Sequence, residues 1–155
     1  MVLKEGEIMD KKRVIVTLLL LALTAVACRR EVARVGSQTT GYSPTVSVQA
    51  VSKATPEEIA RRLITLWLDH YKSPSVKAQE RLAAYELGEI RLTEQKEESF
   101  AVNATLAVKP AEALSDWMAG NGAPGAGGWI RDKFLFFQIS REGSVYRLQV
   151  LGTGP

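Results

Sequence analysis

The sequence predicts an α+β domain over residues 55–155, in which an N-terminal helix packs on a curved, four-stranded antiparallel sheet. Three observations indicate this fold class. Apolar residues first recur at helical spacing, the period then changes to two after residue 84, and short turns separate most of the expected strands. Strands joined by short turns pair antiparallel, and a helix with one apolar face needs a second layer to cover it.

The expected helix begins with Thr55-Pro56-Glu57-Glu58, where a Thr N-cap, a Pro at the first helical position and a Glu three residues after the cap form a capping-box pattern. One face of this helix is apolar, through Ile59, Leu63, Leu66, Trp67 and Tyr71. The helix should end near Lys72, because Pro74 disfavours helical geometry at the residue before it. A second, shorter helix is expected over Ser75–Ala84.

The four expected strands are Tyr85–Thr93, Phe100–Lys109, Trp129–Ser140 and Val145–Leu151. The second alternates most clearly and should bury one face. The third is apolar on both faces, with Ile130, Phe134 and Phe136 on one and Trp129, Leu135, Phe137 and Ile139 on the other. We therefore expect both faces of the sheet to be covered at this strand, at least in part.

The segment Met9–Cys28 has the layout of a secretory signal, with basic residues ahead of a 13-residue apolar run, Val14–Val26. A membrane-spanning helix needs roughly 20 apolar residues. Residues Ala25–Cys28 resemble the lipobox of bacterial lipoproteins, although Ala25 stands where Leu is commonest. The resemblance implies that residues 1–27 are removed and that the Cys28 thiol receives a lipid. The alternative is an ordinary secretory signal in which Cys28 is incidental.

We expect Met9 to be the true start, because Lys4-Glu5-Gly6-Glu7 does not fit the beginning of a signal peptide. N-terminal mapping of the unprocessed precursor tests this. Residues 28–54 are expected to form a flexible tether, because they combine Ser, Thr, Gly and Pro with no sustained apolar period. The alternation of Thr45–Val51 also allows a short edge strand there.

The order of elements over Thr55–Leu151 resembles the NTF2-like and cystatin-like α+β folds. NTF2-like domains often enclose a cavity between helix and sheet. They include ligand-binding, enzymatic and structural members, so the fold does not choose a function.

The charge distribution argues against nucleic acid as a partner. Residues 55–155 carry 12 Lys and Arg against 13 Asp and Glu, a balance of −1. Nucleic-acid binding needs a concentrated basic face. The single cysteine allows no intramolecular disulfide. No cofactor is expected.

The loop Asp116–Trp129 is the most unusual stretch, because two tryptophans flank a glycine-rich centre. The candidate partner-binding or ligand-binding residues there are Trp117, Met118, Asn121 and Trp129. The alternative, which we favour, is that both tryptophans close the open end of the core. The aromatic residues Trp67, Tyr71 and Tyr85 could line a small cavity, but helical spacing is more typical of core positions.

No catalytic constellation emerges from the sequence. His70 is the only histidine, so a zinc cluster is not expected. Gly120–Gly125 matches the dinucleotide-binding glycine pattern, but it precedes an expected strand, where that pattern needs a strand before it and a helix after it. An enzyme using Asp69, Glu86 or Asp116 would need one of these carboxyl groups buried with a raised pKa.

These observations predict a lipoprotein anchored in the cell membrane on its extracytoplasmic side, with a Gram-positive surface favoured over a periplasmic one. Its domain is expected to be non-catalytic and to bind an envelope protein or component. The alternative is a cavity domain that binds a small ligand.

Overall fold

The computed structural model of this 155-residue chain describes residues 34–36, 44–51 and 53–153. The predicted signal peptide and the predicted lipidation site, Cys28, lie outside these residues. Among the described residues, no helix has the length and apolar character needed to cross a membrane.

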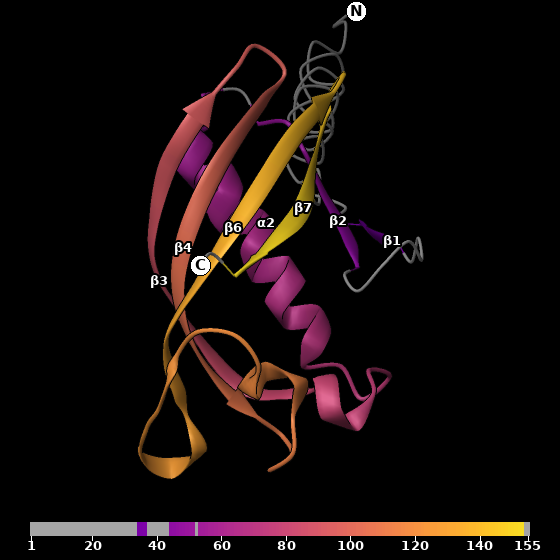
Figure 1. Ribbon diagram of the computed structural model, residues 1–155. Coiled ribbons are helices and arrows are strands. Elements are labelled where there is room, and N and C mark those ends of the chain that lie inside the picture. Colours follow the sequence, from indigo (N-terminus) through magenta and orange to yellow (C-terminus); the bar gives the residue numbers. More distant parts are fainter. Residues whose placement is uncertain (1–33, 37–43, 52, 154–155) are drawn as a thin grey trace, which may run out of the picture. The chain divides into compact units, whose positions relative to one another are not determined.

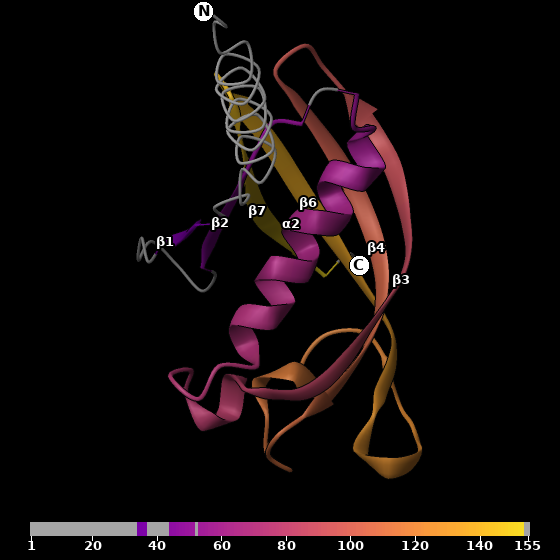
Figure 2. The ribbon, with the colours of Figure 1, turned by 180° about the vertical axis from the view of Figure 1, so that it is seen from behind.

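The fold is α+β, with one helix packed against a curved antiparallel sheet (Figure 1), as predicted. Figure 2 shows the helix in front, lying across the strands. The strand order is β1-β2-β7-β6-β4-β3, and β5 pairs with β6 off this path. The elements are β1 (Arg34–Gly36), β2 (Thr45–Gln49), α2 (Pro56–Tyr71), η1 (Ala78–Glu80), β3 (Leu82–Gln95), β4 (Ser99–Pro110), η2 (Asp116–Met118), β5 (Ala123–Pro124), η3 (Ala126–Gly128), β6 (Ile130–Glu142) and β7 (Val145–Thr153).

Helix α2 starts as its sequence predicts. The Glu58 backbone N–H donates to Thr55 Oγ1 at 3.2 Å, and the Thr55 backbone N–H donates to Glu58 Oε2 at 2.8 Å. This reciprocal pair is the capping box, and it satisfies backbone donors that the first helical turn leaves without partners. The C-cap is Lys72, as expected.

The four predicted strands correspond to β3, β4, β6 and β7, each extended at one or both ends. The sheet is larger than the predicted four strands, because β2 pairs antiparallel with β7 and β1 pairs with β2. Both lie inside residues 28–54, where we expected a tether. Val46 and Val48 are buried in the core, so burial of their side chains explains why the short alternating segment Thr45–Gln49 joins the sheet.

The second predicted helix, Ser75–Ala84, is wrong. This segment holds only the three-residue 3₁₀ helix η1, and β3 already begins at Leu82. Short helices are marginal without support from packing. Here the pairing of Leu82 with Pro110 takes the end of the segment into the sheet instead.

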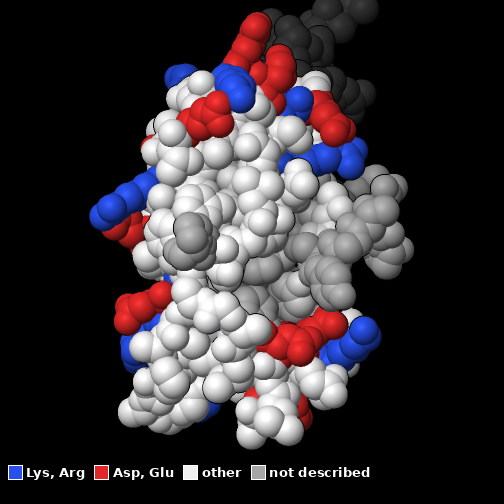
Figure 3. All heavy atoms as spheres, in the orientation of Figure 1, with Lys and Arg blue, Asp and Glu red and all other residues white. Residues whose placement is uncertain are grey.

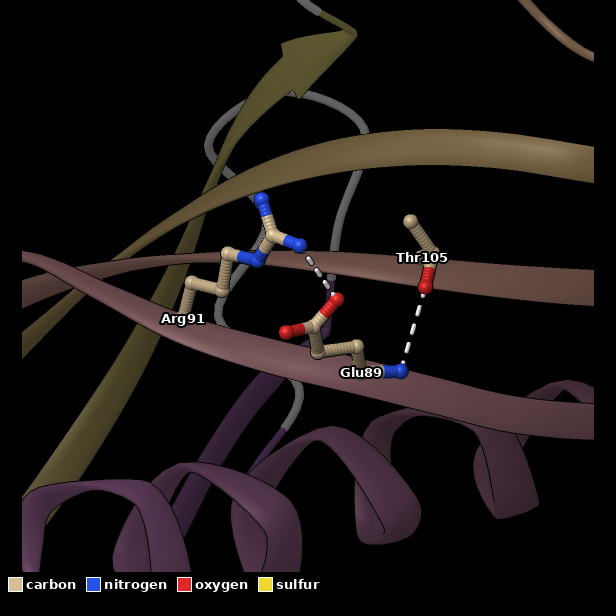
Figure 4. Close-up of polar contacts among 3 residues, drawn as sticks. All are labelled: Glu89, Arg91 and Thr105. Atoms are coloured by element: carbon tan, nitrogen blue, oxygen red, sulfur yellow. Dashed lines mark hydrogen bonds and ion pairs between the residues drawn. The ribbon is translucent and has the colours of Figure 1, made fainter.

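Strand β3 bends because its pairing with β4 is interrupted three times. At one interruption the Glu89 backbone N–H donates to Thr105 Oγ1 at 3.1 Å, and Arg91 donates to the Glu89 carboxylate at 2.7 Å (Figure 4). The neighbouring Gly88 has no room for a side chain, since an added Cβ would lie 2.8 Å from Thr105 Oγ1. Such bulges bend a strand and increase its twist, so β3 can curve over the helix.

The two faces of the sheet differ. The inner face joins α2 in one core, whose largest fully buried side chains include Phe137, Leu63, Ile64 and Leu68. On the outer face Phe134 and Phe136 are only half-buried, and their rings meet edge to face at 5.0 Å between centroids. Ile130, predicted to share the face of these two phenylalanines, is buried with the core instead. Asp132, with φ 57°, lies between Ile130 and Lys133, both buried, and this backbone irregularity changes the alternation.

Candidate functional site

The candidate site is the loop 111–129, which joins β4 to β6 and contains η2, β5 and η3. We call its part Ser115–Asn121 the pinned segment, because four sets of hydrogen bonds hold it to the rest of the domain. The first is the Ser115 hydroxyl, which donates to the Gln79 carbonyl oxygen at 2.6 Å. The loop is therefore fixed at its entrance to the segment that precedes β3.

Trp117 supplies the second set and packs against the core. Its Nε1–H donates to the Glu80 carbonyl oxygen at 2.7 Å. Its ring meets Trp67 at 5.6 Å and Tyr71 at 5.2 Å between centroids, both edge to face. Such aromatic pairs add to the burial of apolar area. This placement agrees with the favoured expectation that Trp117 closes one end of the core.

Lys133 supplies the third set. It is the buried charged residue of the described core, 2% exposed. Its ammonium donates to the carbonyl oxygens of Trp117 at 3.0 Å, Ala119 at 3.0 Å and Asn121 at 2.7 Å. Burial lowers the pKa of Lys133, whereas three carbonyl acceptors favour its charged form. One side chain of β6 thus satisfies three backbone acceptors of the loop.

Asn121 supplies the fourth set. Its side-chain Nδ2 donates to the Phe134 carbonyl oxygen at 2.8 Å, and its Oδ1 accepts from the Phe134 backbone N–H at 2.9 Å. The side-chain amide thereby makes the two hydrogen bonds to Phe134 that a neighbouring strand would make with its backbone. Two residues later, β5 pairs with β6 through Ala123 and Arg131. Gly122 sits between them with φ 112°, where an added Cβ would lie 2.8 Å from Lys133 Cγ.

The outward side of this loop is apolar and acidic. Leu114, next to the pinned segment, is 87% exposed, and Met118 within it is 55% exposed. The two charged side chains of the loop, Glu112 and Asp116, are also exposed, and loop 111–129 contains no Lys or Arg. An apolar side chain exposed next to a backbone that hydrogen bonds hold in place can contact another molecule with little loss of conformational entropy in the loop.

Trp129 lies apart from Trp117, contrary to the expectation that both close the core. It is half-buried and outside the core cluster, and the Arg131 guanidinium carbon lies 5.7 Å from the centroid of its ring. The bulge at Asp132 puts Trp129 out of phase with Leu135, Phe137 and Ile139, the inward residues beyond it. The two tryptophans therefore have different roles.

The three remaining candidates, Trp67, Tyr71 and Tyr85, pack with the core: Trp67 and Tyr71 are part of it, and Tyr85 packs against it. Trp67 and Tyr71 are buried, and Trp67 also meets Phe137 at 5.6 Å. Tyr85 is half-buried, and its hydroxyl donates to Asp69 Oδ1 at 2.8 Å. Burial first, then the Asp69 hydrogen bond and charge, raises the pKa of Tyr85 to about 12.

The other sequence candidates for chemistry are dispersed. His70 meets only the ring of its neighbour Tyr71 among the ring contacts of the described residues, at 5.5 Å, and Asp69, Glu86 and Asp116 are exposed. The glycine pattern Gly120–Gly125 precedes β6 and opens no α-helix. No cluster of three or more potential metal ligands occurs within the described part of the chain.

Sequence reasoning missed Lys133 and Leu114. A signal for Lys133 was present, because strand alternation places it in phase with the buried Leu135, Phe137 and Ile139. Leu114 carried no such signal, since exposed and buried leucines cannot be told apart within an irregular loop.

Comparison with known proteins gives no matching family model, and neither a curated protein nor a solved structure matches the chain.

Proposed function

We propose that this protein is a membrane-anchored extracytoplasmic lipoprotein whose domain binds an envelope protein without catalysis. The lipobox-like Ala25–Cys28 supports the anchor, because the only cysteine of the chain stands where the lipid attaches. Lipid chains contribute about 0.8 kcal/mol per buried CH₂, which suffices for stable anchoring when several are present. A Gram-positive surface remains our preferred location, and an NTF2-like or cystatin-like relationship our preferred view of the fold.

The single observation that carries the binding role is the exposure of two large apolar side chains: Leu114, just before the pinned segment, and Met118, within it. Lys133, Trp117 and Asn121 hold this segment by hydrogen bonds. Fixing a loop before binding lowers the conformational entropy lost when the complex forms. The ring contacts of Trp67 favour this role over a ligand cavity beneath the helix, because three aromatic rings surround it.

Two experiments test the proposal on the full chain in a bacterial host. Metabolic labelling with an alkyne fatty acid should modify the wild-type chain but not Cys28→Ser. A photo-crosslinking amino acid at position 114 or 118 should yield one defined adduct. The same group at the exposed Gln95, at the end of β3, serves as the matched control.

An unlabelled, uncut chain would refute the anchor. Identical adducts from positions 114 and 95, or none from either apolar position, would refute the binding role of the loop.

A further inference from the structure

A hollow of about 320 Å³ lies on the side of the sheet opposite α2, across β3, β4 and β6. Small residues form its floor, namely Gly88, Thr105 and Ala107. Its charged lining consists of Glu86, Arg131 and Asp132. Pockets for small molecules begin at about this volume. We call it the outer hollow.

The backbone around the outer hollow is irregular in all three strands. The pairing of β3 with β4 shifts between Leu87 and Ile90, and that of β4 with β6 shifts between Leu106 and Val108. Asp132 adopts φ 57°, which is uncommon for a residue other than glycine. Bulges and strained residues of this kind concentrate where a protein redirects side chains toward a ligand.

The charges of the outer hollow are accessible. Glu86 Oε2 and Arg131 Nη1 are 3.6 Å apart, and their side chains are 60% and 52% exposed. An ion pair this exposed contributes little to stability, so exchanging it for ligand contacts costs little. The contact of the Arg131 guanidinium with the Trp129 ring restricts the side chain without neutralising its charge. Figure 3 looks onto this side of the sheet, where most charged side chains lie toward the ends and edges.

We infer that the outer hollow binds a small zwitterion of the size of an amino acid or dipeptide. Two carboxylates, Glu86 and Asp132, suit a ligand ammonium group, and the Arg131 guanidinium suits a ligand carboxylate, which it can bind through two parallel hydrogen bonds. The floor carries no charge, as the uncharged middle of such a ligand requires. This site is separate from the pinned segment and does not depend on the proposed function.

Titration calorimetry with the purified full chain in detergent tests the inference. The probes are the common free amino acids and alanylalanine. The comparison probes are N-acetylalanine, which lacks the ammonium group, and alaninamide, which lacks the carboxylate. We expect saturable binding of at least one zwitterion and a loss of about tenfold or more in affinity when either charge is removed, since charge-assisted hydrogen bonds are the strong ones.

Matched variants assign the site. Arg131→Gln and Glu86→Gln should each weaken the binding of the best zwitterion by about tenfold or more while melting like wild type. Glu94→Gln removes a comparable exposed ion pair with Lys96 outside the hollow and should leave binding unchanged.

Absence of saturable binding by every zwitterion would overturn the inference. Singly charged probes that bind as tightly as the best zwitterion would also overturn it. So would a loss of affinity in Glu94→Gln as large as that in Arg131→Gln or Glu86→Gln.

Discussion

The two halves of loop 111–129 each contain one tryptophan, and these two side chains lie in different environments. The first half carries Trp117, which packs on Trp67 and Tyr71, while Trp129 at the end of the second half stands outside the core beside Arg131. The difference comes from polar partners as much as from apolar area. Carbonyl oxygens and a buried ammonium hold the first half, whereas in the second half β5 adds two backbone pairing positions.

A loop segment can therefore be held to its domain by hydrogen bonds and still present apolar side chains outward. Leu114 and Met118 are exposed while their neighbours Ser115 and Trp117 make hydrogen bonds toward the domain.

The largest expected effect is the difference between Trp117→Ala and Trp129→Ala. Loss of a core tryptophan costs about 3–5 kcal/mol, and we expect the lower end of that range for Trp117 because it is only partly buried. Trp129→Ala should cost less than about 1 kcal/mol, the scale of an exposed cation–π contact. Urea unfolding followed by circular dichroism measures both. Equal losses would contradict the separation of the two tryptophans.

The next effect concerns Lys133→Met, which keeps the apolar stem and removes the ammonium. Each buried carbonyl left without a donor costs about 1–3 kcal/mol, and we expect a total loss of about 2–3 kcal/mol because solvent can reach part of the loop. Lys96→Met, at a side chain that is 68% exposed, is the control and should change the free energy of unfolding by less than about 0.5 kcal/mol. Hydrogen exchange should also accelerate in the pinned segment. A Lys133→Met chain as stable as Lys96→Met would show that the three hydrogen bonds from Lys133 to loop carbonyl oxygens do not stabilise the fold.

The smallest effect is the titration of Tyr85, at the border between core and surface. Its folded pKa of about 12 exceeds the ordinary 10.0, so its contribution to stability is fully present below pH 10 and is lost as the pH rises toward 12. Tyrosinate absorbance should show one group titrating near pH 12 that is missing in Tyr85→Phe.

In Asp69→Asn the Tyr85 pKa should fall but stay above 10.0, since burial is the largest cause of its rise. An unchanged titration in Asp69→Asn would mean that the hydrogen bond is not formed in solution.

Sequence reasoning succeeded where the information is local. The capping box of α2 needs only Thr55 and Glu58, three residues apart, and the alternation of β4 is complete within one strand. It failed for Ser75–Ala84, and for Thr45–Gln49 it favoured a tether over the short strand that the alternation allowed, because pairing with distant strands decided both. For the candidate site, the sequence singled out the loop and its tryptophans, but the directions in which Trp117, Trp129 and Met118 point were not predictable from it.

The sequence alone therefore determined the helix, its cap and the alternating strands, because short-range hydrogen bonds and side-chain periodicity act within one element. Only the tertiary structure decided that Lys133 turns inward, that Trp117 and Trp129 separate, and that an outer hollow forms at the bulges. The reason is physical: the deciding contacts join residues 16 positions apart for Lys133 and Trp117, and 37 for Trp117 and Glu80, so their partners exist only once the sheet has assembled.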